Sequence, residues 1–229
     1  MTGLWCIVPA AGRGSRFASE NPKQHVLIGE QTLLGWTLRA LAASPRITGI
    51  VVVVAAGDEQ WKSSASDLTG VQLRSAIGGK QRADSVLSGL AALPECVAAD
   101  DFVLVHDAAR PCIYVDDIDA LIEFAGHSDG GLLAAPLRDT LKRADSDGRV
   151  MATEPRESRW RALTPQMFRR GPLTQALMDA RDAGVMVTDE AMAMERLGHR
   201  PLLVEGRDDN IKVTTLADQQ LAAFLLGHR

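Results

Sequence analysis

The chain has 229 residues, 46% of them hydrophobic, and a formal net charge of −4; this fits one domain with a full core and argues against a general nucleic-acid binder. Its three scattered cysteines do not form the pattern of a disulfide framework or a zinc site. No apolar run reaches the roughly 18 residues of a membrane span and no signal-peptide pattern opens the chain, so we expect a cytoplasmic protein without membrane contact.

Apolar, β-rich runs alternate with helix-period segments over the first half of the chain. We expect strands over residues 4–11, 49–56, 71–77 and 101–109, and helices over residues 32–43, 59–68, 82–93 and 115–126. The run at residues 49–56 lacks polar alternation, which is typical of a parallel strand covered by helices on both faces. This rhythm predicts an α/β fold with a Rossmann-like, doubly wound, mostly parallel sheet.

The alternation stops after Gly130. Residues 131–157 contain two extended stretches around an Asp-Ser-Asp-Gly turn signal, which predicts a protruding β-hairpin. Its polar arms would be marginal alone, so we expect it to pack on a second subunit. Helices near residues 173–183 and 190–197, a strand at 200–206 and a capped final helix follow. We therefore expect a single domain over residues 1–229, with a dimerisation arm over residues 136–158.

The first predicted strand runs into a glycine-rich basic loop, AAGRGSRF. Gly12 and Gly14 let the backbone approach a ligand and direct N–H groups at an anion, at the sheet edge where ligands bind. A dinucleotide fingerprint needs a third glycine where Phe17 stands, and the Gly-Lys-Ser/Thr of a Walker A loop is absent. Two interpretations remain: a nucleotidyltransferase loop, in which Arg16 and Lys23 contact a triphosphate, and a solvated basic turn.

Two further stretches follow predicted strands. GGKQRADSV, residues 78–86, is either a backbone-lined pocket edge or a plain strand-to-helix turn, and in isolation the plain turn is favoured. VLVHDAARP, residues 103–111, ends an apolar strand with His106 and Asp107. A carboxylate there can hold Mg²⁺, which prefers oxygen ligands. We expect Asp107 to be functional and His106 to be a packed histidine.

Cations gather in the C-terminal half of the chain. Lys212 follows Ile211 in what reads as a short strand before the last helix, and Arg156 stands at the root of the predicted hairpin. The hairpin cations are equally compatible with a binding patch and with a solvated surface. No Gly-x-Ser-x-Gly elbow or His-Glu-x-x-His motif is present, so the sequence offers no nucleophile machinery.

Taken together and in order, these stretches resemble the 2-C-methyl-D-erythritol 4-phosphate cytidylyltransferase family of the non-mevalonate isoprenoid pathway. The matching segments are PAAGRGSR, PKQ, GGKQRADSV, VHDAARP, APLRDT, LTPQ, TDEA and VEGRDDNIKVT, spread over nearly the whole chain. The resemblance implies CMP transfer from CTP to a polyol phosphate with release of pyrophosphate. It also implies Mg²⁺ or another divalent cation, and a β-arm that interlocks a homodimer with shared active sites.

The resemblance also implies roles for individual residues. The catalytic set would be Arg16, Lys23, Arg156 and Lys212. The CTP pocket would be lined by Pro9, Ala10, Ala11, Gly12, Gly14, Gly79 and Ser85. The methylerythritol phosphate would be held by Asp107, Arg110, Thr140 and Thr188. Lys80 departs from the family, where an acidic residue is expected, and base selectivity would be affected only if its side chain is used.

The implied reaction does not need a nucleophilic side chain from the protein. A phosphate monoester has a second pKa of about 6, so the attacking group is already ionised at neutral pH. Catalysis then rests on positioning and on cations that offset the assembled negative charge. Two alternatives remain open: a cytidylyltransferase for another polyol phosphate such as ribitol 5-phosphate, and a non-catalytic nucleotide-binding protein.

Overall fold

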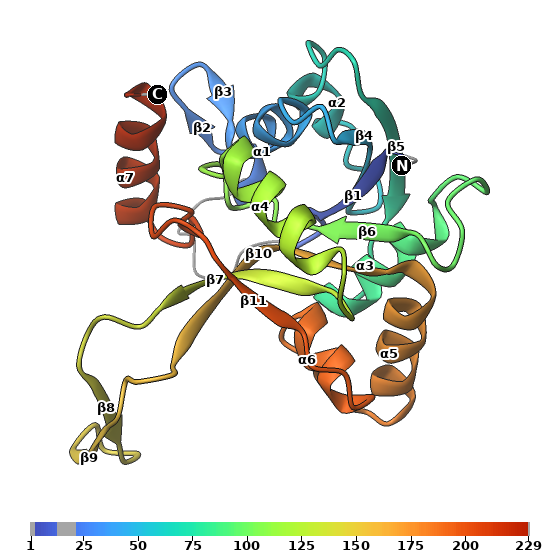
Figure 1. The fold of residues 1–229 in the computed structure, drawn as a ribbon. Helices are drawn as coiled ribbons and strands as arrows, with labels where there is room; N and C mark the ends of the chain where they lie inside the picture. Colours follow the sequence, from blue (N-terminus) through green and yellow to red (C-terminus); the bar gives the residue numbers. More distant parts are fainter. Residues whose placement is uncertain (1–2, 13–21, 229) are drawn as a thin grey trace.

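A mostly parallel β-sheet flanked by helices forms the centre of the computed structural model, which describes residues 3–12 and 22–228 (Figure 1). Within these residues the sheet has seven strands in the order β11–β7–β10–β6–β1–β4–β5. Strand β10 pairs antiparallel with β6 and β7, and the other pairs are parallel. The expected α/β fold is confirmed. The strands are β1 Leu4–Pro9, β4 Ile47–Val54, β5 Gln72–Ile77, β6 Phe102–Val105, β7 Gly131–Pro136, β10 Trp160–Arg169 and β11 Leu202–Glu205.

Both faces of the sheet are covered at β4, which explains the unbroken apolar run in that strand. Ile50 and Val52 pack in one hydrophobic cluster, whereas Val51 and Val53 pack in the other, because successive side chains of a strand point to opposite faces. In Figure 1 the first group of helices lies above the sheet and the second below it. The first group is α1 Leu33–Ala42, α2 Trp61–Ser64 and α4 Val115–Ala125; the second is α3 Arg82–Ala91, α5 Arg170–Asp182 and α6 Glu190–Arg196.

Three local expectations are corrected. The helix expected at residues 59–68 shrinks to α2, because the hydroxyls of Ser63 and Ser66 bond to nearby backbone carbonyls at 2.7 and 3.0 Å and compete with helix formation. Residues 160–168, for which we expected no element, form most of β10. Lys212 lies in an irregular segment rather than a strand, which Val213 N–H anchors to Ala109 O at 2.8 Å.

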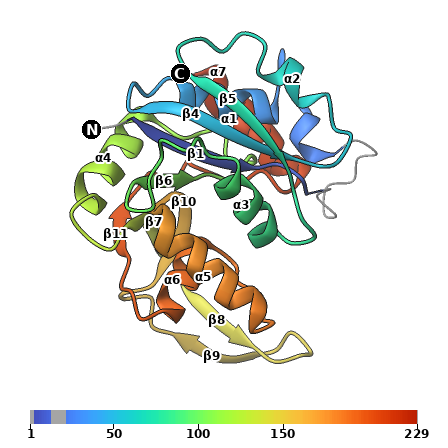
Figure 2. The ribbon, with the colours of Figure 1, turned by 90° about the vertical axis from the view of Figure 1, so that its right-hand side faces the viewer.

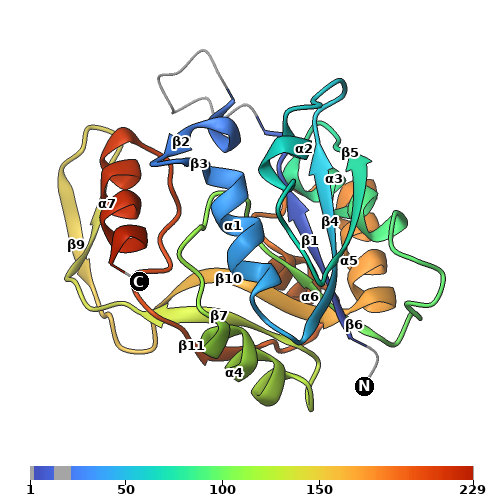
Figure 3. The ribbon, with the colours of Figure 1, turned by 90° about the horizontal axis from the view of Figure 1, so that it is seen from above.

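The last helix, α7 Leu216–Gly227, closes a third, smaller apolar cluster beside the sheet. Thr215 caps its N-terminus, and the Thr215 hydroxyl accepts a bond from Asp218 N–H at 3.2 Å in the expected capping box. Figure 3 shows α7 beside the short hairpin β2 Leu27–Ile28 and β3 Gln31–Thr32. Gln219 donates a bond to Leu27 O at 2.8 Å. This side of the molecule carries the one-turn helix η1, Lys23–His25.

A two-stranded hairpin projects away from the sheet between β7 and β10 (Figures 1 and 2). Its strands are β8 Leu141–Ala144 and β9 Val150–Glu154. The connecting turn is closed by Asp145, whose carboxylate accepts from Arg149 N–H at 2.8 Å, and by Gly148 in the left-handed region at φ 78°. Val150 and Met151 are 65% and 61% exposed, so this arm leaves apolar side chains uncovered in the single chain.

Candidate active site

A pocket of about 360 Å³ lies where β1 and β6 end, in the range of small-molecule sites. In the sheet, β1 has β4 on one side and β6 on the other. The chain continues from β1 to β4 and later returns to β6, so the pocket sits where the strand order reverses. Open α/β sheets bind ligands at this topological switch point. Its walls come from the loops after β1, β5 and β6, from η1 and from the segment that carries Lys212.

The loop after β1 forms the floor of the pocket. Ala10 N–H continues the sheet by bonding to Val53 O at 2.7 Å, which fixes the direction in which the loop leaves. Of the residues expected to bind CTP, those that line the pocket are Pro9, Ala10, Ala11, Gly12, Gly79 and Ser85. Gly14 and Arg16 lie outside the described residues.

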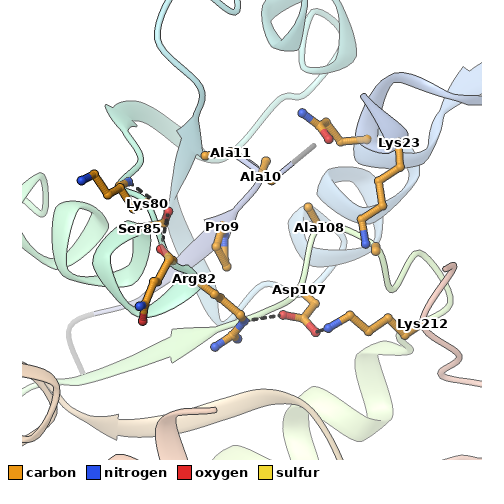
Figure 4. A pocket seen from close by; sticks show the side chains of 15 residues that line it. Pro9, Ala10, Ala11, Lys23, Lys80, Arg82, Ser85, Asp107, Ala108 and Lys212 are labelled. Carbon is orange, nitrogen blue, oxygen red and sulfur yellow. Dashed lines mark hydrogen bonds and ion pairs between the residues drawn. The ribbon is translucent and has the colours of Figure 1, made fainter. Parts of the chain in front are cut away.

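The loop between β5 and α3 approaches this floor closely. A side chain at Gly78 would meet the Ala11 Cβ at 2.4 Å, so the glycine is required for the two loops to pack. Gly79 N–H donates to the Ser85 hydroxyl at 3.2 Å. Ser85 lies in the first turn of α3, which begins at Arg82. Gly79 and Lys80 of this loop line the pocket, while Figure 4 shows the Lys80 side chain directed away from Asp107 and Lys23.

Asp107 stands on the opposite wall, two residues after β6, and is paired with two cations. Its Oδ2 lies 2.7 Å from the Lys212 ammonium and its Oδ1 lies 2.9 Å from Arg82 Nε (Figure 4). Burial by itself would raise the pKa of Asp107, but the charges of Arg82 and Lys212 outweigh it and hold that pKa well below its ordinary value. Asp107 is therefore an anion that orients cations.

The same pairing does not fit the expectation that Asp107 holds a metal ion. Both carboxylate oxygens already accept bonds from cations, which would repel Mg²⁺. Over residues 3–12 and 22–228 we also find no group of three or more acidic, histidine or cysteine side chains that could hold a metal.

Behind Asp107, a buried polar cluster fixes the end of β6. His106 Nε2 faces Arg110 O at 3.0 Å, so this nitrogen carries the hydrogen. The Thr164 hydroxyl accepts from Asp107 N–H at 3.0 Å and donates to His106 Nδ1 at 3.1 Å. Burial lowers the pKa of His106 to about 4, so the ring is neutral at neutral pH. His106 is the packed histidine that the sequence suggested.

Lys23 reaches the pocket from η1, on the other side from the β5–α3 loop. Figure 4 shows its side chain extending toward Asp107 and Lys212. The helix η1 is anchored at its last residue, because His25 Nε2 lies 2.8 Å from the Asp58 carboxylate in the loop after β4. Lys23 and Lys212 thus face one space from two independently anchored segments, as cations that act on a shared anionic ligand must.

Not all of the expected residues line this pocket. Arg110 lies behind Asp107, with its Nε 3.8 Å from the carboxylate and its Nη1 donating to Asn210 O at 2.7 Å. Thr188 is exposed just before α6, with its hydroxyl near Met192 Sδ at 3.6 Å. Thr140 and Arg156 belong to the arm, where Arg156 donates to the backbone carbonyl of Arg138 in the same arm. None of these four is among the lining residues.

The sequence reasoning missed Arg82, Gln24 and Thr164. Arg82 and Gln24 line the pocket, and Thr164 holds the backbone of Asp107. All three stand within segments that carried the resemblance, namely GGKQRADSV, PKQ and LTPQ, so their segments were recognised while their side chains were given no role. Arg82 was hidden because its partners are contributed by residues far away along the chain.

Comparisons with known proteins give one consistent result. The family model for IspD, 2-C-methyl-D-erythritol 4-phosphate cytidylyltransferase, matches residues 4–228. A curated protein of that name from Xanthomonas axonopodis pv. citri is 57% identical over 234 residues, covering 100% of this chain and 86% of that protein. One from Stenotrophomonas maltophilia (strain R551-3) is 56% identical over 228 residues, covering 99% of this chain and 97% of that protein.

Solved structures agree with these sequence matches. The crystal structure of 2-C-methyl-D-erythritol 4-phosphate cytidylyltransferase from Francisella tularensis superposes with a TM-score of 0.83 at 34% identity, covering 98% of this chain and 100% of that one. The enzyme of the same name from Thermus thermophilus gives a TM-score of 0.79 at 30% identity, covering 98% of both chains.

Proposed function

The chain belongs to the 2-C-methyl-D-erythritol 4-phosphate cytidylyltransferase family, and we propose that the pocket between β1 and β6 is where it transfers CMP from CTP to that polyol phosphate. The family resemblance inferred from the sequence is confirmed, and so is the expectation of a nucleotidyltransferase of isoprenoid biosynthesis. The alternative acceptor, ribitol 5-phosphate, gains no support from the comparisons.

One observation carries the placement of the reaction: Lys23 and the Asp107–Lys212 pair face each other across a glycine-lined floor at the switch point of the sheet. CTP lies along the floor, with Gly79 and Ser85 beside its nucleoside and the loop after β1 beside its phosphates. The methylerythritol phosphate enters on the side of Lys212. Its phosphate oxygen thereby comes into line with the α-phosphorus of CTP.

The reaction forms one bond and breaks one. A phosphate oxygen of the polyol phosphate bonds to the α-phosphorus of CTP, and the bond from that phosphorus to the bridging oxygen of the β-phosphate breaks. Pyrophosphate leaves with the electron pair, and no proton has to be removed from the attacking anion. Lys23 offsets the charge that develops at the α-phosphate and on the leaving group, while Lys212 holds the incoming phosphate.

The divalent cation enters this proposal only as an ion that CTP brings with it. Mg²⁺ prefers phosphate oxygens and a few carboxylates as ligands, and it keeps several of its waters. Among the described residues that line the pocket, the only carboxylate is that of Asp107, which is engaged by Arg82 and Lys212. We therefore assign no protein ligand to the ion.

We further propose that two chains form a homodimer in which each arm completes the partner's site. Arg156 and Thr140 do not line the pocket of their own chain, and the arm exposes Val150 and Met151. An isologous pair places the same patch of each chain against the other, so both sites are completed together. Arg156 would then hold the polyol phosphate bound in the partner.

We also propose a cytoplasmic location. Cys96 is an exposed free thiol, and Cys6 and Cys112 are free and buried, which suits a reducing compartment. In a separate finding, none of the helices formed by the described residues is long and apolar enough to cross a membrane.

The proposed activity is tested by following pyrophosphate release from CTP with each candidate acceptor. We expect release with 2-C-methyl-D-erythritol 4-phosphate, and slower release with ribitol 5-phosphate at equal concentration. Detection of the cytidine-diphosphate product by mass spectrometry excludes plain hydrolysis of CTP. An equal or faster rate with ribitol 5-phosphate would favour the alternative acceptor, and the lack of release with any acceptor would favour a non-catalytic nucleotide-binding protein.

A further inference from the structure

A fully buried carboxylate lies behind the pocket without lining it. Glu190 is the first residue of α6 and is 0% exposed. Its Oε1 accepts from Arg82 Nη1 at 2.6 Å and its Oε2 accepts from Arg82 Nη2 at 3.1 Å. Burying a carboxylate is unfavourable unless it is paired and hydrogen-bonded. Because Glu190 is buried, it does not contribute to the charge of the protein surface, and its role must be sought in its contact with Arg82.

The guanidinium of Arg82 also contacts Asp107, which lines the pocket. Its third donor, Nε, bonds to Asp107 Oδ1 at 2.9 Å, on the edge of the group that Glu190 leaves unoccupied. The other oxygen of Asp107 lies 2.7 Å from the Lys212 ammonium. A continuous chain of charges therefore runs from Glu190 through Arg82 and Asp107 to Lys212, and alternates in sign at every step.

The fixed geometry of arginine gives this chain a direction. The guanidinium is planar, so two bonds from its Nη atoms to one carboxylate fix the plane in which Nε–H points. Glu190 also prevents Arg82 from turning its two Nη atoms toward Asp107. Asp107 is thereby limited to a single bond with Arg82, and its second oxygen stays available to Lys212.

The start of α6 is itself firmly held, so Glu190 can act as a fixed point. The Asp189 carboxylate accepts from Met192 N–H and from the Gln166 side chain, both at 2.9 Å. Gln166 in turn accepts from Ala191 N–H at 2.8 Å and is 1% exposed in the middle of β10. The backbone on both sides of Glu190 is tied to the central sheet.

We propose that Glu190 is a positioning residue for the transfer reaction: acting through Arg82, it orients Asp107 so that Lys212 faces the incoming polyol phosphate. This inference rests on the function proposed above. It predicts that Glu190 affects use of the polyol phosphate, on the side of Lys212, and leaves CTP binding, on the side of Gly79, nearly unchanged.

The first test compares Glu190→Gln with wild type, with each substrate varied in turn. Glutamine keeps the shape but cannot accept from both Nη atoms, so we expect kcat/KM for the polyol phosphate to fall about 10-fold, a typical effect of losing a charged hydrogen bond. The KM for CTP should stay within about twofold, because the CTP side is untouched. Asp129→Asn is a matched control, since it removes the Asp129–His199 pair beyond the far end of α6.

The second test separates positioning from a general structural role. In a double-mutant cycle, Glu190→Gln should change kcat/KM by less than about twofold once Lys212→Ala is present, because the group it orients is gone. Effects that multiply in the cycle would refute the proposal, and so would an equal loss for CTP and for the polyol phosphate. If Glu190→Gln does not fold, Glu190→Asp replaces it in the same cycle, with the same refuting outcomes.

The outcomes also distinguish this inference from the proposed function. A wild-type protein that releases no pyrophosphate from CTP and the polyol phosphate contradicts the function itself. An active wild-type protein whose Glu190→Gln variant matches the Asp129→Asn control contradicts only the role of Glu190.

Discussion

The carboxylate of Asp107 and the ammonium of Lys212 lie 2.7 Å apart in the lining of the pocket, although the two residues come from opposite halves of the chain. Asp107 lies two residues after β6, while Lys212 sits in an irregular segment anchored through the backbone of Val213. An ion pair between two separately anchored residues fixes both side chains, so Lys212 is held ready for an anionic ligand before that ligand arrives.

This relationship predicts the behaviour of Asp107→Asn. The neutral amide no longer offsets the charges of Arg82 and Lys212, so we expect kcat/KM for the polyol phosphate to fall by about 10-fold or more. The Mg²⁺ concentration that gives half-maximal rate should not change, because both oxygens of Asp107 are already bonded to Arg82 and Lys212. Initial rates across a Mg²⁺ titration measure both quantities. A marked rise in the Mg²⁺ requirement of the variant would show that Asp107 does hold the ion.

Lys23→Ala tests the opposite wall of the pocket. We expect kcat to fall on the order of 10²–10³-fold, which is typical of losing one preorganised contact to developing charge. The KM for the polyol phosphate should change little, because that substrate is held from the side of Lys212. Saturation kinetics in both substrates provide the values. A near-normal kcat at saturating CTP would rule out the role given to Lys23.

The buried ring of His106 predicts a pH dependence of stability. Its pKa is about 4 in the folded chain, against an ordinary value of about 6.5. Between these pH values the unfolded chain binds a proton that the folded chain does not. The free energy of unfolding should therefore decrease as pH falls from about 6.5 to about 4, by on the order of 3 kcal/mol from this residue.

Denaturant unfolding at several pH values measures this slope for wild type and for His106→Gln. The variant should be less stable near neutral pH, where the His106 contacts to Thr164 and Arg110 are lost, yet its stability should depend less steeply on pH within this window. Parallel curves for the two proteins would mean that His106 does not remain neutral in the folded state.

Much of the fold could be predicted from the sequence because its signals are local. The apolar run in β4, the alternation of strands and helices, and the capping box at Thr215 each depend on residues close together in the chain. Strand β10 could not be recognised in this way. Its residues 163–168 are buried on both faces, and it contains Pro165, so it shows neither alternation nor a clear strand pattern.

The functional site likewise contains residues that could be predicted from the sequence and contacts that could not. The glycine-rich loop and Asp107 could be placed at one sheet edge, because parallel strands bring their carboxyl ends together. The contact between Arg82 and Glu190 could not, because it depends on how folding brings the first residues of α3 and α6 together. The magnesium role of Asp107 was inferred from residue type alone, and the two cations beside it change what that carboxylate can do.

The most direct test of the shared active site is to mix chains carrying Lys23→Ala with chains carrying Arg156→Ala under conditions that let subunits exchange. Each variant alone should be nearly inactive with CTP and 2-C-methyl-D-erythritol 4-phosphate. A mixed dimer has one site with both lesions and one site with neither, if Arg156 serves the partner. Random exchange makes roughly half the dimers mixed, so pyrophosphate release should recover to roughly a quarter of the wild-type rate. If exchange is verified and the rate stays at the level of the single variants, Arg156 serves its own chain and the shared site is contradicted.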